Sequence, residues 1–337
     1  MADFKTGNRR PFLIRGIAGV IWVLLLWVGS RAVSGQTTTP SSRSSGPGEK
    51  VPKTITLPEA ISLIRQSTVQ INYLVEGEPG TFTKPQMGLF GTGFDVGDGY
   101  FITAKHVVDA FQTMAINIPK GKKSLGIGIA SINRLNVRAG FRVFEVEVID
   151  QDAIHDLALL HEIHRDTPLY ETLGSITFGS SSGLSPQDPI FPTLEPVRLS
   201  IKRPEDGDGI ATSGYPLNQA VLLTTSGTVA SSWGFYDSTY APPNAPAGFA
   251  MSKLEDSYLA DLRVNHGNSG GPVYSITTGA VVGVCQAYEN AEVAIGNTTV
   301  IVEGKPLVYN SGVSLFVPAR YVAALLDKNK VKWTAAK

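Results

Sequence analysis

The chain has 337 residues, 42% of them hydrophobic, and its 29 basic and 29 acidic residues leave no formal net charge. This balance gives no sign of the basic surface with which nucleic-acid-binding proteins contact phosphates, so nucleic acid is not an expected partner. The single cysteine, Cys285, excludes an intrachain disulfide framework, and the length suits about two compact units of ~150 residues.

Residues 1–35 have the features of an export segment. Basic residues precede an uncharged apolar run at 16–29, which is shorter than the ~20 residues of a membrane-spanning helix and favours a signal peptide. The apolar run lengthens if it includes the residues from 12 onward, so a membrane anchor over 12–30 is the alternative. Both interpretations place the rest of the chain outside the cytoplasm. Residues 36–55, rich in Ser, Thr and Pro, predict a flexible linker.

The folded part is expected to open with a short helix, because apolar residues recur at helical spacing from Leu57 to Ile64. Alternation over 69–75 then predicts a strand, and the pattern over 94–102 predicts a hairpin that turns at its central glycines. The second strand of this hairpin runs on to His106. We therefore expect His106 at the end of a strand, where a rigid frame can hold it.

An acid-rich loop follows the alternating strand predicted at 144–148. Only Asp156 leads directly into an apolar strand, so we expect Asp156 to orient a histidine, with Asp152 as the alternative. Three histidines in and after this loop match no familiar pattern of metal ligands, and no cysteine accompanies them, so no metal or cofactor site is expected. These histidines are His155, His161 and His164.

Two stretches rich in Ser, Gly and Pro, 165–196 and 236–256, are predicted to be loops. The remaining β-rich segments and one amphipathic helix complete the second half of the chain. Strands are expected at 210–215, 221–229, 280–287 and 314–317, the last strand, and the closing helix at 321–326. Within 280–287, Cys285 is expected to be a buried small apolar residue.

The stretch 265–273 places Ser269 between glycines, in a run with little bulk, directly before a predicted strand. Gly267 allows a tight turn, so that the N–H groups of Gly267 and Ser269 can point at one spot and hold a developing oxyanion. Gly270 and Gly271 leave room for a carbonyl group to approach the serine. A Gly-Asn-Ser turn without chemistry is the plainer interpretation of this stretch taken alone.

A serine is a weak nucleophile until a base accepts its proton and a carboxylate orients that base. The chain supplies these groups in the order His106, Asp156, Ser269, each at a separate local motif. This is the order of chymotrypsin, and it differs from the orders of subtilisin and the α/β-hydrolases. The three motifs together favour nucleophilic catalysis over a plain turn.

In these motifs the chain resembles the trypsin-like serine peptidases of the chymotrypsin fold, and within them the HtrA/Deg branch. The similar stretches are 91–94, 103–108, 156–160, 214–216, 224–229, Asp261 and 267–272. The resemblance implies an all-β fold of two antiparallel six-stranded β-barrels with short terminal helices, in a protease domain over 56–330. Barrel one is expected at about 66–165 and barrel two at about 197–318. His266 departs from the family pattern, which usually has proline there, and no PDZ module is expected.

The resemblance implies a two-step acyl transfer. Ser269 would attack a peptide carbonyl, His106 would accept and return the proton, and Asp156 would hold the imidazole, while the N–H groups of Gly267 and Ser269 form the oxyanion hole. Asn268 would shape this loop. For His266, a plain surface position is favoured over a role in tuning the loop or sensing pH.

The strand after the serine loop lines the specificity pocket in this family, so Cys285, Gln286 and Ala287 are expected to bind substrate. Arg263 stands six residues before Ser269, where trypsins have an acid at the base of the pocket, and an arginine cannot favour a basic substrate side chain. If Arg263 points into the pocket, acidic substrate residues are favoured. If it points elsewhere, the small aliphatic preference of HtrA enzymes is expected, and this second version is preferred.

The expected function is a serine endopeptidase that acts on exported or misfolded proteins in the periplasm or elsewhere outside the cytoplasm. Its partners would be polypeptide substrates and, by resemblance to HtrA enzymes, two further copies in a homotrimer. The alternative is a catalytically silent binding or scaffold protein of the cell envelope that has kept the protease fold. A closed oxyanion hole would leave the three residues in place without turnover.

Overall fold

The computed structural model describes residues 54–336, with gaps at 76–85, 118–121, 132–137, 164–167, 169, 176–187, 220, 233–256 and 297. The predicted export segment, nearly all of the linker and the predicted loop at 236–256 lie outside the described residues. Within the described part, no helix has the length and apolar character needed to cross a bilayer.

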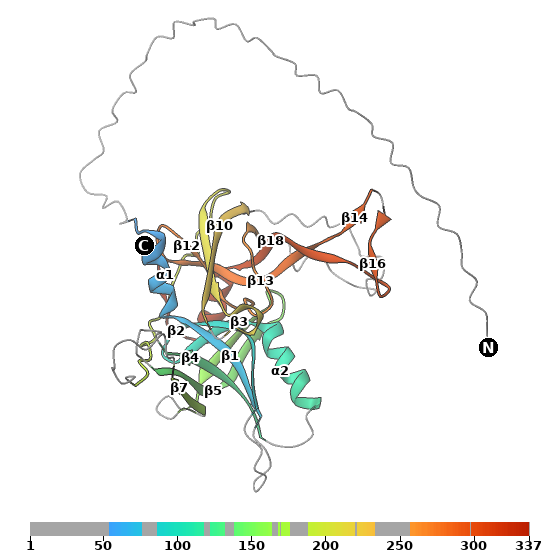
Figure 1. Ribbon diagram of the computed structural model, residues 1–337. Coiled ribbons are helices and arrows are strands. Elements are labelled where there is room, and N and C mark those ends of the chain that lie inside the picture. The colour runs from blue at the N-terminus through green and yellow to red at the C-terminus, as the bar shows by residue number, and fades with distance from the viewer. Residues whose placement is uncertain are drawn as a thin grey trace, which may run out of the picture. The chain divides into compact units, whose positions relative to one another are not determined.

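Strands make up most of the described chain, and they form two closed antiparallel barrels of six strands each (Figure 1). The first barrel has the order β4-β1-β2-β3-β6-β5, and the pairing of β4 with β5 closes it. Its strands are β1 (Thr68–Val75), β2 (Gln86–Gly97), β3 (Tyr100–Ala104), β4 (Lys123–Ala130), β5 (Arg138–Asp152) and β6 (Leu157–Glu162). An additional strand, β7 (Tyr170–Ser175), pairs with β5. The stretch 165–196, predicted to be loop throughout, therefore contains a strand.

The second barrel has the order β12-β9-β10-β11-β18-β13 and is closed by the pairing of β12 with β13. Its strands are β9 (Gly209–Gly214), β10 (Leu223–Ser231), β11 (Tyr258–Asp261), β12 (Pro272–Ser275), β13 (Val281–Glu292) and β18 (Val308–Pro318). The short strands β8 (Arg198–Leu199) and β19 (Thr334–Ala335) extend this sheet in parallel. The predicted double-barrel fold is thereby confirmed, although 314–317 is not the last strand, since β19 follows it.

In the described residues, three α-helices accompany the barrels: α1 (Leu57–Arg65), α2 (Lys105–Asn117) and α3 (Ala319–Lys328). The helix predicted from Leu57 is confirmed, and a capping box between Thr56 and Glu59 fixes its start. The helix α2 was not predicted, because the β-branched pair Val107 and Val108 continues the apolar pattern of β3. His106 consequently lies in the first turn of a helix and not at the end of a strand. A 3₁₀ turn, η1 (Pro216–Asn218), follows β9.

A shared hydrophobic core joins the two barrels. One buried cluster contains Leu157 and Leu159 from the first barrel together with Val281 from the second. The helices α1 and α3 add Ile64 and Leu326 to the same cluster, and both side chains are almost completely buried. Burial of this kind is worth about 1.5–3 kcal/mol for each large apolar side chain. The relative position of the barrels is therefore set by packing as well as by the connections between them.

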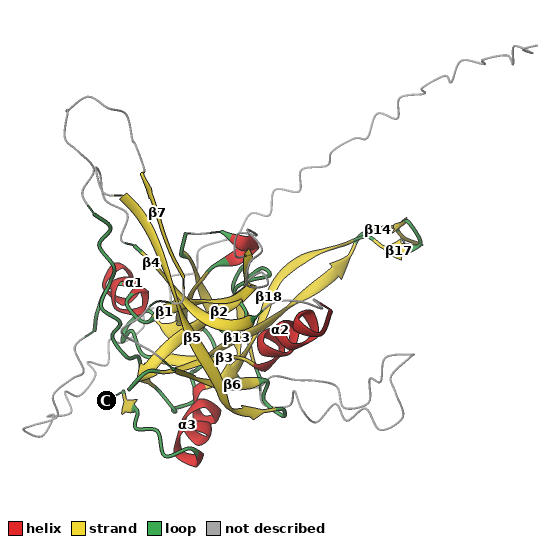
Figure 2. Ribbon diagram, turned by 90° about the horizontal axis from the view of Figure 1, so that it is seen from below, coloured by secondary structure: helices red, strands yellow, loops and turns green. Residues whose placement is uncertain are grey.

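Beyond the second barrel, β13 and β18 continue as a paired ribbon that stands off the barrel (Figures 1 and 2). The strand predicted at 280–287 thus extends to Glu292, and the strand predicted at 314–317 begins at Val308. Four short strands lie between them: β14 (Ala294–Ile295), β15 (Thr298–Thr299), β16 (Ile301–Val302) and β17 (Lys305–Pro306).

Candidate active site

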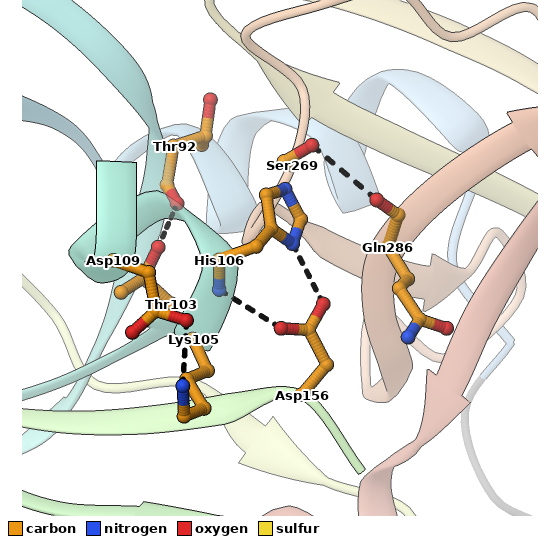
Figure 3. Close-up of polar contacts among 8 residues, drawn as sticks. All are labelled: Thr92, Thr103, Lys105, His106, Asp109, Asp156, Ser269 and Gln286. Atoms are coloured by element: carbon orange, nitrogen blue, oxygen red, sulfur yellow. Dashed lines mark hydrogen bonds and ion pairs between the residues drawn. The ribbon is translucent and has the colours of Figure 1, made fainter. Parts of the chain in front are cut away.

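His106 lies in the first turn of α2, and Asp156 lies in the turn between β5 and β6. The imidazole Nδ1 is 2.7 Å from one carboxylate oxygen of Asp156, and the backbone N–H of His106 donates to the other oxygen at 2.9 Å (Figure 3). Because a carboxylate only accepts, Nδ1 carries the proton of the neutral imidazole and Nε2 is an acceptor. Nε2 is on the side of the ring that faces Ser269 (Figure 3).

The start of α2 explains why Asp156 is held in place. The first N–H groups of a helix have no acceptor within the helix and favour a nearby negative charge. Asp156 accepts two of them, because its carbonyl oxygen accepts the N–H of Lys105 at 2.9 Å and its carboxylate accepts the N–H of His106. Asp156 has a φ of 54°, a left-handed conformation that aspartate tolerates better than most side chains. One residue therefore caps the helix and orients the histidine.

Ser269 lies in the loop between β11 and β12, in the second barrel. Its hydroxyl donates to the carbonyl oxygen of Gln286 on β13 at 3.3 Å (Figure 3). Within the described residues no hydrogen bond joins Ser269 to His106, so the hydroxyl is turned toward β13. Catalytic hydrogen bonds are often long or poorly aligned in a free enzyme and tighten with substrate. A rotation of the serine side chain would be required for the hydroxyl to reach Nε2 of His106.

Thr92 of β2 connects this serine loop to the first barrel. Its N–H donates to the carbonyl of Ser269 at 2.9 Å, and its hydroxyl donates to the carbonyl of Gly267 at 2.6 Å. The same hydroxyl accepts the N–H of Tyr215 at 3.0 Å, and its carbonyl accepts the Thr103 hydroxyl at 2.7 Å (Figure 3). Thr92 is fully buried. The N–H and hydroxyl of Thr92 thus hold the loop of Ser269 against the barrel that carries His106, and its carbonyl bonds within that barrel.

The peptide between His266 and Gly267 has a fixed orientation. The carbonyl of His266 accepts the N–H of Leu217 at 2.7 Å, and the N–H of the same peptide points the opposite way. Gly267 has a φ of 99°, and a Cβ there would lie 2.3 Å from the carbonyl oxygen of Tyr215. Among the described residues, the N–H groups of Gly267 and Ser269 have no acceptor. Two free donors separated by one residue can hold a negatively charged oxygen.

His266 is exposed, as expected, but it is not free. Its Nε2 is 3.0 Å from the hydroxyl of Tyr288, and the two rings meet edge to face at 5.6 Å. Tyr288 lies on β13, two residues after Gln286. The side chain of His266 is thereby tied to β13 while its carbonyl is tied to Leu217.

Asp152, the alternative to Asp156, has a different partner. Its carboxylate is 2.6 Å from Nδ1 of His155, whose ring stacks on Tyr321 of α3 at 3.5 Å. Burial opposes the charge of Asp152, but the hydrogen bonds from the side chain and backbone of His155 outweigh it and lower the pKa of that carboxyl. Within the described part of the chain, no three His, Cys, Asp or Glu residues lie close enough together to hold a metal ion.

The residues expected to bind substrate lie at two places. Gln286 presents its carbonyl to Ser269. Of its two neighbours, Cys285 is buried and Ala287 is exposed. Arg263 is exposed and lines one pocket together with Thr225, Ser226 and Asp261, whereas the residues on either side of Arg263 are buried in the core of the second barrel.

The glycines after Ser269 face protein and not open space. Gly270 has a φ of 82°, and a Cβ there would lie 2.2 Å from the hydroxyl of Thr103 and 2.3 Å from the carbonyl of Thr92. A Cβ on Gly271 would lie 2.9 Å from the carbonyl of Asn268. The room predicted here for a substrate carbonyl is therefore filled, and Gly270 is needed for the close approach of the two barrels.

A family model described as a trypsin-like peptidase domain matches residues 91–284, which include His106, Asp156 and Ser269. The chain belongs to the trypsin-like peptidase family. Among curated proteins, none matches the chain. Membership of this family, together with the double barrel, makes the protein a protease of the chymotrypsin fold, whose substrates are polypeptides.

Three residues of this peptidase site were not assigned a role from the sequence: Thr92, Leu217 and Tyr288. Thr92 stands between two glycines in a strand, a pattern that indicates close backbone approach. Leu217 and Tyr288 act through contacts with residues about 50 and 20 positions away, and no local pattern marks either of them.

Burial raises the pKa of the Cys285 thiol to about 12, so the reactive thiolate is scarce at ordinary pH. We expect iodoacetamide at about pH 8 to leave Cys285 unmodified in the native protein and to alkylate it once urea unfolds the chain. Intact mass spectrometry measures both states. Alkylation of the native protein at the rate of a free thiol would contradict this burial.

Proposed function

We propose that the protein is a serine endopeptidase in which Ser269 is the nucleophile, His106 the general base and Asp156 the residue that orients it. The pairing of His106 with Asp156 at 2.7 Å is the observation that carries this proposal. It leaves Nε2 as an acceptor on the side of Ser269, as a general base requires. A rotation of Ser269 away from Gln286 would bring its hydroxyl to that nitrogen.

The reaction would proceed through an acyl-enzyme. Ser269 Oγ attacks the peptide carbonyl as His106 accepts its proton, and His106 then protonates the leaving amine. The N–H groups of Gly267 and Ser269 would hold the oxyanion, and the loss of one such donor typically lowers turnover by ~10²–10³. A water molecule, activated by His106, then attacks the ester and releases the acyl product, and Ser269 regains its proton. The carbonyl of Gln286, released from Ser269, would be free to accept a backbone N–H of an extended substrate.

The site of action and the natural substrates rest on the sequence. The basic and apolar pattern of residues 1–35 supports action outside the cytoplasm. The motifs shared with HtrA enzymes support exported or misfolded proteins as substrates and small aliphatic residues at the cleaved bond. The exposed Arg263 lines a pocket with Thr225, Ser226 and Asp261, and Ser269 is not among the lining residues, which is compatible with that preference.

Casein cleavage by the full chain and by Ser269→Ala tests the proposal. Loss of a catalytic serine lowers turnover on the order of 10⁶-fold. Asp156→Asn should lower turnover by about 10⁴-fold, since the imidazole would be held in the wrong tautomer. The matched variant Asp152→Asn should retain most activity, because Asp152 contacts His155 and not His106.

Three results would contradict the assignment. Equal activity of Ser269→Ala and the natural protein would exclude Ser269 as the nucleophile. A larger loss of turnover in Asp152→Asn than in Asp156→Asn would assign the orienting role to Asp152 in place of Asp156. Inactivity of every form, with the fold intact by circular dichroism, would favour the binding protein that has kept the protease fold.

Tyr288→Phe tests whether the contact between Tyr288 and His266 holds the proposed oxyanion hole. The substitution removes one hydroxyl, whose hydrogen bond is worth about 0.5–1.5 kcal/mol. We expect kcat to fall between about twofold and tenfold with KM unchanged, because the oxyanion forms only after substrate binds. Thermal unfolding is the control for stability. An unchanged kcat would make His266 a plain surface residue.

A further inference from the structure

The ribbon formed by β13 and β18 beyond the barrel, residues 289–312, is called the arm here. Its two strands pair from Asn290 with Asn310 to Glu292 with Val308. At its tip the hairpins β14–β15 and β16–β17 meet the end of the ribbon at residues seven apart, and the three backbones form a closed cycle. The N–H of Val293 donates to the carbonyl of Leu307, Leu307 to Val300, and Val300 to Val293, each at 2.8 Å.

None of the described residues of the arm is buried. Six large apolar side chains are nevertheless exposed near its tip by between 42% and 77%: Ile295, Ile301, Val302, Leu307, Val308 and Tyr309. Ordering a residue costs about 1–2 kcal/mol, and isolated two-stranded ribbons are only marginally stable. An exposed group of apolar residues on such a ribbon marks an interaction surface.

The arm is continuous with the peptidase site. The strand β13 passes Ser269 at Gln286 and continues to Glu292, with shifts in its pairing with β18 between Cys285 and Ala287 and between Tyr288 and Asn290. On the edge opposite β18, the pairing with β12 stops at Val284, and the described residues supply no strand to that edge beyond it. The trypsin-like family match stops at residue 284, before the arm.

We propose that the arm binds an apolar, extended segment of the polypeptide substrate, on the N-terminal side of the bond that is cleaved. When an extended substrate segment pairs antiparallel with the open edge of β13, its N-terminal residues lie at the tip of the arm and its C-terminal residues lie at Ser269. The segment that contacts the arm therefore precedes the cleaved bond. The inference rests on the proposed function, because it needs Ser269 as the site of cleavage.

The length of β13 sets the size of substrate that contacts the arm. Six residue steps separate Gln286 from Glu292, which correspond to about 20 Å of extended chain. A substrate therefore needs about six or more residues before the cleaved bond to reach the exposed apolar side chains. The arm would therefore select unfolded polypeptides, because folded proteins bury their apolar extended segments.

The test substitutes one apolar residue in each of the two hairpins and one at the end of the ribbon, as Ile295→Thr, Ile301→Thr and Val308→Thr together. Threonine keeps the preference for strand, so the ribbon is retained while its apolar surface is removed. Ile201→Thr, at a residue exposed by 53% outside the arm, is the matched control. Two peptide substrates that share one cleaved sequence are compared, with two or with eight apolar residues before the bond.

For the long peptide, kcat/KM should fall by about tenfold in the triple variant, because apolar contacts at the tip are lost. For the short peptide it should change by less than about twofold, and Ile201→Thr should change neither. An equal fall on both peptides would mean that the arm supports the site and does not bind substrate. An unchanged value on the long peptide would also overturn the proposal.

Binding separates this inference from the proposed function. Fluorescence anisotropy of the labelled long peptide is measured with full-length Ser269→Ala, with and without the triple substitution. About tenfold weaker binding in the triple variant supports the arm even if no form shows turnover. Equal binding overturns it. Light scattering measures the oligomeric state of the peptide-free protein. If the natural protein is an oligomer and the triple variant is not, the arm binds a second copy of the chain and the proposal is overturned.

Discussion

The hydrogen bonds of Thr92 are the constraint on which the site depends. A trypsin-like site is divided between two barrels, so the distance between His106 and Ser269 can only be as well defined as the contact between the barrels. Thr92 uses its N–H, hydroxyl and carbonyl to join β2 to the serine loop, to Tyr215 and to β3. Because Thr92 is fully buried, loss of its hydroxyl would leave buried partners without hydrogen bonds, at about 1–3 kcal/mol each.

The other features of the site follow from this junction. Gly270 must lack a side chain because Thr92 and Thr103 fill the space beside it. On the opposite side, the start of α2 supplies the N–H groups that hold Asp156, so the acid and the histidine are oriented by one helix end. Ser269 is oriented by β12 and β13 of the second barrel. Rigid strands and one helix therefore hold the polar groups, and in the proposed mechanism the side chain of Ser269 is the part that rotates.

Local pattern was sufficient to predict several strands, the first and last helices and the proposed catalytic residues, because each is marked by alternation, by helical spacing or by glycines beside a polar side chain. The double barrel was predicted from the resemblance to trypsin-like peptidases and not from local pattern. It failed for α2, where Val107 and Val108 resemble a continuing strand. It also failed for Thr92 and Tyr288, whose roles come from residues distant in sequence. The arm contains turn glycines such as Gly304, but no local pattern indicates that its strands leave the barrel with apolar side chains exposed.

The most direct test of the account is the rate at which a fluorophosphonate labels Ser269 in the natural protein, in Thr92→Val and in Thr92→Ser. Valine keeps the shape of threonine and removes the hydroxyl that joins the barrels, whereas serine keeps the hydroxyl. We predict that the natural protein is labelled at Ser269 and that Thr92→Val is labelled at least about tenfold more slowly. The rate for Thr92→Ser should be close to that of the natural protein. Equal rates in Thr92→Val and the natural protein, or no labelling of the folded natural protein, would contradict the account.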